Sequence, residues 1–450
     1  MDLINRASVD SEEQHRLYSK IASRLLPLLL LMYVVSFLDR INVGFAKLQM
    51  AGSIGLSDAQ YGLGAGIFFL GYCVFEIPSN LMLHRVGARL WIARIMIVWG
   101  LVTMLTLLVQ GPRSFYAARV LLGVAEAGFY PGIILYLTTW FPTKVRSQIM
   151  AIFICGIVIA GMLGGPISGG IMAGLDGAWG FAGWQWLFAL EGLPAILLGI
   201  VCLRSLPNGP ASARWLTDEE RTLHEEDQRR DRAATRSLPG QAYRIGLVFR
   251  NRNIWLLVIA NFSNLATSYA VSFWMPQIVR NFGLTKNLAV IGLITSAPFL
   301  LAGIAMLFAG RYADRTGDRR RPLCVGLFVA CVGLTMTGLY MSVPGAAFSG
   351  LVLACVGTMV ATPTLWALPG MFLSGSAAAA GIALMTTVGN LSGYVAPFLI
   401  GVIKEATGSM AYGFILLAGF ALAGMIAVLY APVTRTPGSP SPATDAPVVR

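Results

Sequence analysis

A few ionisable residues lie inside strongly apolar stretches of this 450-residue sequence. Asp39 and Arg40 stand near the end of the apolar run Leu25–Val43, and Arg119 and Glu126 stand seven residues apart in a later run. A charge inside a membrane helix costs at least about 2.5–3.5 kcal/mol on insertion scales. Carboxylates close to arginines are suited to proton exchange and anion binding, because arginine keeps its charge and offers a planar fork to a carboxylate.

Both pairs also have a simpler interpretation. Asp39 and Arg40 would lie at the membrane interface, where arginine can snorkel, and Arg119 and Glu126 would form a static ion pair that holds helix packing. The spacing of seven places the second pair on one helix face, about 10 Å apart, and Tyr130 follows on that face. We favour a water-filled path, since burial and a nearby cation act in opposite senses on a carboxylate and so allow proton exchange.

The elements that position these residues are membrane helices. The chain is 56% hydrophobic and 12% charged, whereas soluble proteins carry about 25% charged residues. This composition, with no signal-peptide cleavage site, predicts an all-α polytopic membrane protein. We predict twelve transmembrane helices, at 21–43, 61–83, 88–110, 113–139, 147–173, 184–206, 253–279, 287–310, 322–342, 346–372, 376–403 and 409–431.

Lysine and arginine are distributed unequally between the alternate loops. One side holds most of them, whereas the other has only Lys47, Arg113, Arg280, Lys286 and Lys404. The positive-inside rule places the rich side in the cytoplasm. We therefore expect both termini to be cytoplasmic, in a bacterial-type inner (plasma) membrane. The net charge of +12 follows from this topology and does not indicate a nucleic-acid partner.

The longest polar stretch divides the spans six and six. Within it, Thr217 and Glu220 have the spacing of a helix-starting capping box. The tail is rich in Pro and Ser, which predicts disorder. The expected organisation is a cytoplasmic N-terminal segment (1–20), a first six-helix bundle (21–206), a cytoplasmic linker with a short amphipathic helix (207–252), a second six-helix bundle (253–431) and a disordered cytoplasmic tail (432–450).

A short motif repeats in the two halves. Arg-x-Gly-x-Arg follows the second span as Arg85 to Arg89 and the eighth span as Arg315 to Arg319. Its recurrence indicates two similar bundles. Parallel repeats of this kind place a binding site between the halves, near the middle of the membrane.

The chain resembles the major facilitator superfamily over nearly its whole length. Gly310–Arg320 fits the loop signature G-x-x-x-D-R-x-G-x-R-[RK], whereas the first copy has Asn80 for Gly and His84 for Asp, which weakens a gate-stabilising contact. The resemblance implies the major facilitator fold, with two six-helix bundles related by pseudo-two-fold symmetry. Four stretches are similar to the anion:cation symporter family of tartrate, phthalate, sugar-acid and sialin-like carriers: FLDRINVGFA, FEIPSNLMLHRVGARLWIARI, RVLLGVAEAGFYPGIILYLTTWFP and GWQWLFALEGLPAILLGI.

In that fold the first and fourth helices line the central cavity, so the resemblance implies that Asp39, Arg40, Arg119 and Glu126 share one polar pocket. It also implies that Asp39 and Glu126 are the proton-coupling acids and that Arg40 is an anion ligand. The complete set of expected substrate-binding residues is Arg40, Arg119, Tyr33, Tyr72, Tyr130, Asn264 and Asn390. The expected gating residues are Glu76, Arg85, Arg89, Asp314, Arg315 and Arg319.

Some of these residues have a second interpretation. Tyr33 and Tyr72 could simply line or pack helices, and Glu76 could be an interface contact. Glu191 is expected to bond to a neighbouring helix or loop. The glycine series 161, 165 and 169, and the pair 62 and 66, each form a small-residue face that predicts close helix approach.

The expected function is that of a proton-coupled secondary transporter that imports an organic acid anion, with a tartrate-like dicarboxylate or a hydroxy or sugar acid as first choice. The alternatives are an importer of an aromatic acid, a drug or metabolite:proton antiporter, and a membrane sensor that binds without transport. The short tails and the single modest loop disfavour a sensor. No P-loop, metal-site or nucleophile motif is present, so we expect no enzyme activity, no cofactor besides the coupling proton, no metal and a monomer in the lipid bilayer.

Overall fold

The computed structural model describes residues 4, 9, 11–236, 250–368 and 375–431, so the tail 432–450 lies outside the described residues. Within these ranges the chain is helical and has no β-strand. The α-helices are α1 Glu12–Ser53, α2 Asp58–Val86, α3 Ala88–Leu105, α4 Pro112–Glu126, α5 Phe129–Trp140, α6 Thr143–Gly174, α7 Gly183–Ser205, α8 Asp218–Arg236, α10 Arg252–Asn281, α11 Leu288–Thr316, α12 Arg320–Leu339, α13 Pro344–Ala367, α15 Gly375–Thr407 and α16 Ala411–Tyr430.

Twelve stretches of the described chain are helical, long and apolar enough to cross a membrane, which confirms the predicted number. Most bounds agree with the prediction within a few residues. The fourth stretch, Pro112–Trp140, combines α4 and α5. The first helix is longer than predicted at both ends. At its start, the Ser11 side chain caps the helix by accepting a hydrogen bond from the Gln14 backbone N–H (3.2 Å). At its other end, the helix continues past Lys47 to Ser53.

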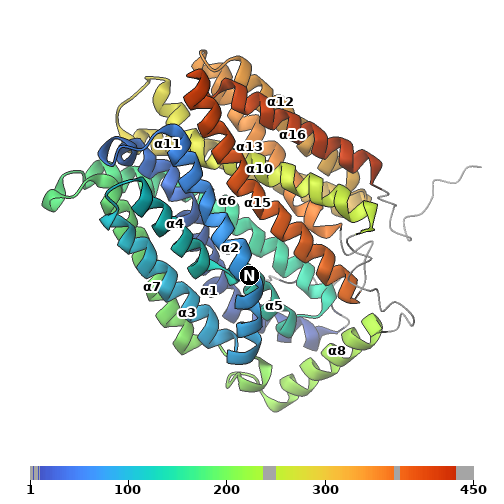
Figure 1. Cartoon of the computed structure of the whole chain (residues 1–450). Coiled ribbons are helices and arrows are strands. Elements are labelled where there is room, and N and C mark those ends of the chain that lie inside the picture. Colours follow the sequence, from blue (N-terminus) through green and yellow to red (C-terminus); the bar gives the residue numbers. More distant parts are fainter. Residues whose placement is uncertain (1–3, 5–8, 10, 237–249, 369–374, 432–450) are drawn as a thin grey trace, which may run out of the picture.

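The helices form two six-helix bundles (Figure 1). In the first, α3 packs against α7, α2 against α4, and α1 against α6. In the second, α12 packs against α13 and α16, and α10 against α16. In Figure 1 the blue-to-green helices of the first bundle lie mainly at the lower left, and α10, α12, α13, α15 and α16 of the second bundle lie above them and to the right.

The bundles meet most closely along two helix pairs, α2 with α15 and α6 with α11. A Cβ atom added at Gly165 would lie 2.2 Å from the carbonyl oxygen of Gly292, and one added at Gly62 would lie 2.5 Å from that of Pro397. Both distances are shorter than a van der Waals contact, so only glycine permits these approaches. The predicted small-residue faces are therefore confirmed, and they join the two bundles.

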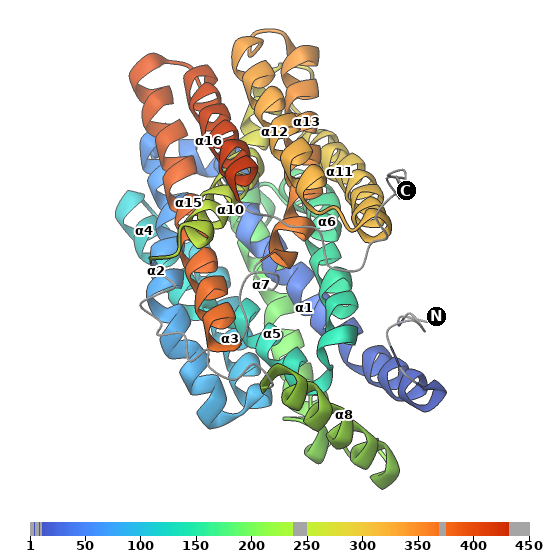
Figure 2. The same ribbon diagram turned by 90° about the vertical axis from the view of Figure 1, so that its right-hand side faces the viewer.

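Helix α8 packs against the start of α1 and is confirmed as a surface helix. The Thr217 hydroxyl accepts from the Glu220 backbone N–H (3.2 Å), and the Glu220 carboxylate accepts from the Thr217 N–H (2.9 Å), which is the predicted capping box. Asp227 accepts hydrogen bonds from Gln14 (2.7 Å) and Tyr18 (3.0 Å) of α1. Figure 2 shows α8 and the first turns of α1 at one end of the molecule, called here the α8 end; the opposite end is the Lys47 end.

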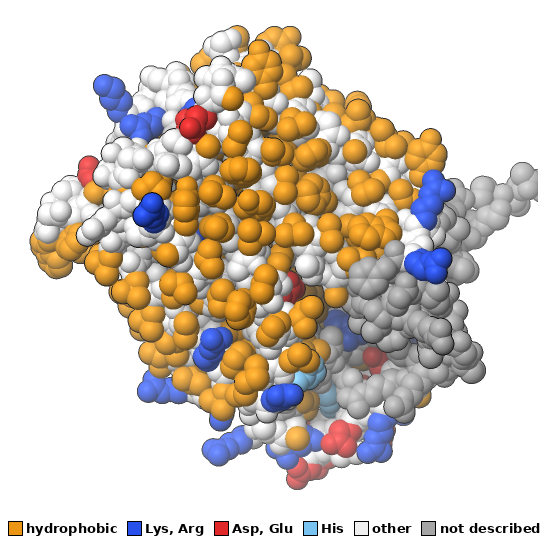
Figure 3. Space-filling model, in the orientation of Figure 1, with side chains coloured by type: hydrophobic (Ala, Val, Ile, Leu, Met, Phe, Trp, Pro, Cys, Tyr) orange, Lys and Arg blue, Asp and Glu red, His pale blue; other side chains and the backbone are white. Residues whose placement is uncertain are grey.

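The outer surface suits a lipid environment. Hydrophobic side chains cover a broad band between the two ends, and most Lys and Arg side chains in this view lie toward the ends of the molecule (Figure 3). Large apolar side chains such as Val74 (67% exposed) and Phe308 (64% exposed) lie on this surface. In water such a patch would favour aggregation, whereas in a bilayer it contacts lipid chains.

Candidate functional site

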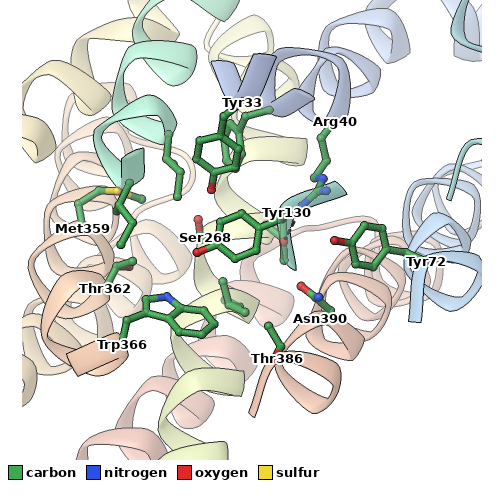
Figure 4. A pocket seen from close by; sticks show the side chains of 15 residues that line it. Tyr33, Arg40, Tyr72, Tyr130, Ser268, Met359, Thr362, Trp366, Thr386 and Asn390 are labelled. Carbon is green, nitrogen blue, oxygen red and sulfur yellow. Dashed lines mark hydrogen bonds between the residues drawn. The ribbon is translucent and has the colours of Figure 1, made fainter. Parts of the chain in front are cut away.

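A pocket lies between the two bundles, with about 730 Å³ of space free of protein atoms, its open part included. Its wall combines α1, α2, α5 and α6 of the first bundle with α10, α13 and α15 of the second (Figure 4). The lining residues are Tyr33, Phe37, Arg40, Tyr72, Tyr130, Ile154, Ile157, Leu265, Ser268, Tyr269, Met359, Thr362, Trp366, Thr386 and Asn390.

Arg40 is the one charged residue among the described residues that line this pocket, and it forms an ion pair with Glu126. Glu126 is fully buried, and its Oε1 also accepts a hydrogen bond from the Ser36 hydroxyl (2.9 Å). Its other oxygen, Oε2, has no hydrogen-bond partner among the described residues. The carboxylate therefore has one oxygen committed to the guanidinium and one that is able to carry a proton.

Glu126 is the last residue of α4, where the fourth span is interrupted. Ala127 leaves the helical conformation (ψ 130°) and Gly128 is left-handed (φ 83°) before α5 begins at Phe129. A side chain at Gly128 would also collide with the Ser79 hydroxyl, 2.3 Å from a Cβ atom built there. Interrupted helices near the middle of a membrane are typical of transporter binding sites. The sequence prediction of one continuous helix at 113–139 missed this break.

Aromatic groups surround the guanidinium of Arg40. Its carbon atom Cζ lies 5.4 Å from the ring centroids of both Phe68 and Tyr72. Its Nη1 donates to the Tyr269 hydroxyl at 3.5 Å, a long contact across the two bundles. Ring faces attract a cation, so these rings help to hold the guanidinium at the pocket wall.

Asp39 does not line the pocket, which corrects the expectation that all four charged residues share it. Its carboxylate accepts hydrogen bonds from Trp99 Nε1 (2.6 Å), Thr103 Oγ1 (2.8 Å) and Asn42 Nδ2 (3.1 Å). The bonds from Trp99 and Thr103 tie α1 to α3, away from Arg40. Successive residues of a helix point about 100° apart, so Asp39 and Arg40 face different neighbours. A proton-coupling role for Asp39 remains a prediction.

Arg119 is also absent from the pocket wall. It is 1% exposed and lies between α4 and α2, where its Nη2 donates to the Ala65 carbonyl at 3.5 Å and its Cζ lies 5.0 Å from the Phe68 ring. Its Nε and Nη1 atoms have no partner among the described residues. The simpler interpretation, a static ion pair between Arg119 and Glu126, is not found in this structure, because Arg40 forms the ion pair with that carboxylate.

The remaining predicted substrate ligands divide into two groups. Tyr33, Tyr72, Tyr130 and Asn390 all line the pocket, and no described residue hydrogen-bonds their polar side-chain atoms. Asn264 does not line it, but donates to the hydroxyl of the lining residue Thr362 (2.9 Å). Asn264 thus positions part of the wall.

The predicted gating residues lie mostly at the α8 end. Arg85, Arg89, Asp314 and Arg315 are exposed, and Arg319 is half-buried. Glu76 is buried, with one oxygen lacking a partner among the described residues. Gating by these residues remains a prediction. Glu191, by contrast, accepts from the Ser168 hydroxyl of α6 (2.8 Å), which confirms its expected bond to a neighbouring helix.

A charged cluster that the sequence prediction missed joins the bundles at the Lys47 end. Asp58 of α2 forms ion pairs with Lys47 of α1 (2.6 Å) and Lys404 of α15 (2.9 Å). Lys47 is 3% exposed, and its amine lies 3.6 Å from the ring centroid of Trp274 of α10. Glu405 caps the start of α2, accepting from the Ser57 hydroxyl (2.6 Å) and the Ala59 N–H (2.9 Å). We call Lys47, Asp58, Trp274 and Lys404 the Lys47 cluster.

Several residues of the site are absent from the predicted set. Ser36 donates to Glu126, Tyr269 accepts from Arg40, and Ser268 and Trp366 line the pocket. Tyr269 stands in a polar stretch of the seventh span, which was a usable signal. Trp366 has no such signal, because a tryptophan near a span end usually marks the membrane interface. Among the described residues no group of three His, Cys, Asp or Glu side chains could hold a metal ion.

The fold and the site thus define a multi-pass membrane protein with a polar pocket between two bundles, and comparisons with known proteins agree. The family model of the Major Facilitator Superfamily matches residues 29–290 and 278–449. The chain belongs to this superfamily, whose members are transporters and not enzymes.

Two bacterial relatives are similar over most of their length. A protein of Agrobacterium vitis named "Putative tartrate transporter" is 43% identical over 426 residues, covering 94% of this chain and 96% of the relative. A protein of Acinetobacter baumannii named "Quinolone resistance transporter" is 39% identical over 418 residues, covering 92% of this chain and 94% of the relative. A solved structure of the xylose transporter XylE from E. coli in an inward open conformation shares the fold, with a TM-score of 0.70 and 16% identity. The similarity covers 92% of this chain and 97% of the XylE chain.

Proposed function

We propose that this protein is a proton-coupled importer of an organic acid anion, with both termini on the cytoplasmic side of a bacterial inner membrane. The ion pair between Arg40 and the buried Glu126 carries the proposal. It lies at a pocket that both bundles form, where alternating access requires the binding site to be. The orientation rests on the excess of Lys and Arg at the α8 end.

Charge balance explains why such a pair couples anion binding to a proton. With Glu126 ionised, Arg40 is already neutralised, and a substrate carboxylate would bring an uncompensated negative charge into a buried site. An unpaired buried ion costs several kcal/mol. When Glu126 takes up a proton, the guanidinium is free to pair with the substrate and the pocket is again neutral. Loaded and empty forms can then both close around a neutral site.

The transport cycle follows from this exchange. From the outward-open form, Glu126 accepts a proton, for which Oε2 is available, and Arg40 turns to the substrate carboxylate. The bundles then close at the Lys47 end, where the Lys47 cluster joins them, and the pocket becomes accessible from the α8 end. Substrate leaves toward the cytoplasm, the proton follows, and Arg40 pairs with Glu126 again for the return.

The relatives support an organic acid and also one different candidate. The name of the Agrobacterium relative fits a carboxylate substrate, whereas that of the Acinetobacter relative fits extrusion of a drug. The second candidate function is therefore drug:proton antiport, in which Glu126 would exchange a proton for the drug. Both candidates use the same buried acid, so the direction of proton movement must distinguish them.

The test uses purified protein in proteoliposomes that contain a pH-sensitive dye. An importer of acid anions should acidify the lumen when a carboxylate such as tartrate or benzoate is added outside at equal pH. An antiporter should make the lumen more alkaline when a quinolone is added outside. These signs do not depend on how the protein is oriented in the vesicle. Proton movement with the quinolone and none with any carboxylate would overturn the proposal.

A further inference from the structure

The pocket has an unusually aromatic lining for a site that binds a small polar acid. Six of its 15 lining residues carry aromatic rings: Tyr33, Phe37, Tyr72, Tyr130, Tyr269 and Trp366. Only Arg40 carries a charge. In Figure 4, Arg40, Tyr72 and Asn390 lie to one side, whereas Tyr33, Trp366 and Met359 lie to the other, with Tyr130 between them.

The rings on the side away from Arg40 form a connected wall. The Tyr33 and Tyr130 ring centroids are 5.4 Å apart with the planes tilted by 32°, and those of Tyr130 and Trp366 are 6.4 Å apart at 56°. Tyr33 is supported from behind by Phe153, stacked at 4.3 Å. Such separations are those of interacting aromatic pairs. The wall is therefore held in place, and a planar ring could extend it.

A tartrate-like dicarboxylate fits this pocket poorly. It would need a second cation, but Arg119 is buried between α4 and α2 and does not reach the wall. Its second carboxylate would instead meet the neutral hydroxyl groups and ring faces of the pocket lining, which cannot balance its charge. Polar groups that are buried without partners weaken binding.

We infer that the substrate is an aromatic monocarboxylate, with its carboxylate on Arg40 and its ring against Tyr33, Tyr130 and Trp366. This inference rests on the proposed function and specifies its substrate class. Trp366 is then the specificity-determining residue, because it is the ring that the second bundle adds to the wall. A ligand that contacts Tyr130 of the first bundle and Trp366 of the second also joins the bundles, so its ring contributes to closure.

The test measures binding of three probes to the purified protein in nanodiscs at pH 6, by isothermal titration calorimetry. Benzoate carries one carboxylate and an aromatic ring, cyclohexanecarboxylate carries the same carboxylate on a saturated ring, and tartrate carries two carboxylates and no ring. We expect benzoate to bind at least tenfold more tightly than tartrate and several-fold more tightly than cyclohexanecarboxylate.

Variants of Trp366 test whether the aromatic wall is the cause of the preference for benzoate. Trp366→Ala should weaken benzoate binding about tenfold and change tartrate binding less than threefold, and Trp366→Phe, which keeps a ring, should retain most of the benzoate affinity. Trp179→Ala is the matched control, since Trp179 is 87% exposed at the Lys47 end. Thermal unfolding of each variant confirms that it is folded.

The outcomes separate this inference from the proposed function. Tighter binding of tartrate than of benzoate, or an equal loss of both probes in Trp366→Ala, would overturn the aromatic assignment while leaving carboxylate transport intact. Failure of all three carboxylates to bind would overturn the proposed function together with it.

Discussion

Arg40 of α1 forms an ion pair with Glu126, the last residue of α4, at the point where the fourth span is interrupted. The pair is almost fully buried, with side-chain exposures of 12% and 1%. Because neither charge is stable there alone, any step that neutralises Glu126 must supply Arg40 with another anion. In the proposed function, this requirement links proton uptake to substrate binding.

The first prediction concerns the pH dependence of carboxylate binding. If one proton enters with each substrate anion, the apparent Kd should rise about tenfold per pH unit above the range where the site titrates. Affinity is thus highest at low pH and lost as the pH rises. Calorimetry with benzoate between pH 5 and pH 9 measures the slope. A Kd that stays constant over this range would show that binding takes up no proton.

The second prediction concerns Arg40 as the anion ligand. Removing Arg40 alone would leave Glu126 buried and unpaired, so the informative comparison is between Glu126→Gln and the double variant Arg40→Gln with Glu126→Gln. The double variant loses the charge-assisted hydrogen bonds to the carboxylate, worth about 1.5–3 kcal/mol, and its Kd should be about 10- to 100-fold higher. Equal affinities of the two variants for the carboxylate would show that Arg40 does not bind it.

The third prediction separates Asp39 from substrate binding. Asp39→Asn keeps the size of the side chain but weakens the bonds from Trp99 and Thr103. The free energy of unfolding should fall by about 1–3 kcal/mol, whereas the Kd for a carboxylate should stay within about threefold of the unmodified value. Calorimetry and thermal unfolding measure the two effects. A loss of binding comparable with that of the Arg40 variant would show that Asp39 does take part in substrate binding.

The fourth prediction concerns the Lys47 cluster. Asp58→Asn leaves the buried Lys47 and the neighbouring Lys404 without their shared partner, and breaking a buried pair typically costs about 3–5 kcal/mol. Forms closed at the Lys47 end should therefore become less populated.

Spin labels at Ser53 and Ala406, in a background without the native cysteines, report the separation of α1 and α15 at this end. The distance distribution of Asp58→Asn should shift to longer values. Lys286→Ala, which removes an exposed lysine at the same end, is the control and should not move it. An unchanged distribution in Asp58→Asn would mean that the cluster does not stabilise closure.

The sequence predicts the helices well because each apolar run must satisfy its backbone hydrogen bonds within the membrane. It predicts the end of α1 poorly. Lys47 was assigned to the loop after the first predicted span, which ended at residue 43, yet here it remains helical and buried. Its partners Asp58 and Trp274 come from two other helices, and the residues next to Lys47 in the sequence do not predict such contacts.

The site shows the same division between local and tertiary information. Arg40, Tyr33, Tyr72, Tyr130 and Asn390 were selected by residue type and by family resemblance, and all reach the pocket. Asp39 was placed there with Arg40 although adjacent helical residues diverge by about 100°. Which of the two faces the pocket depends on the rotation of α1 against α3, and packing alone sets that rotation.

Proton-driven accumulation by Glu126→Gln tests the central claim most directly. The amide side chain of this variant cannot release a proton, so Arg40 stays available for a carboxylate but the coupling is lost. In proteoliposomes with an inward pH gradient, the uptake of benzoic acid by diffusion is measured in protein-free liposomes and subtracted. We then expect no accumulation of labelled benzoate by this variant, while exchange of labelled for unlabelled benzoate continues at a rate similar to that of the unmodified protein. Concentrative uptake by Glu126→Gln under the same gradient would contradict the account.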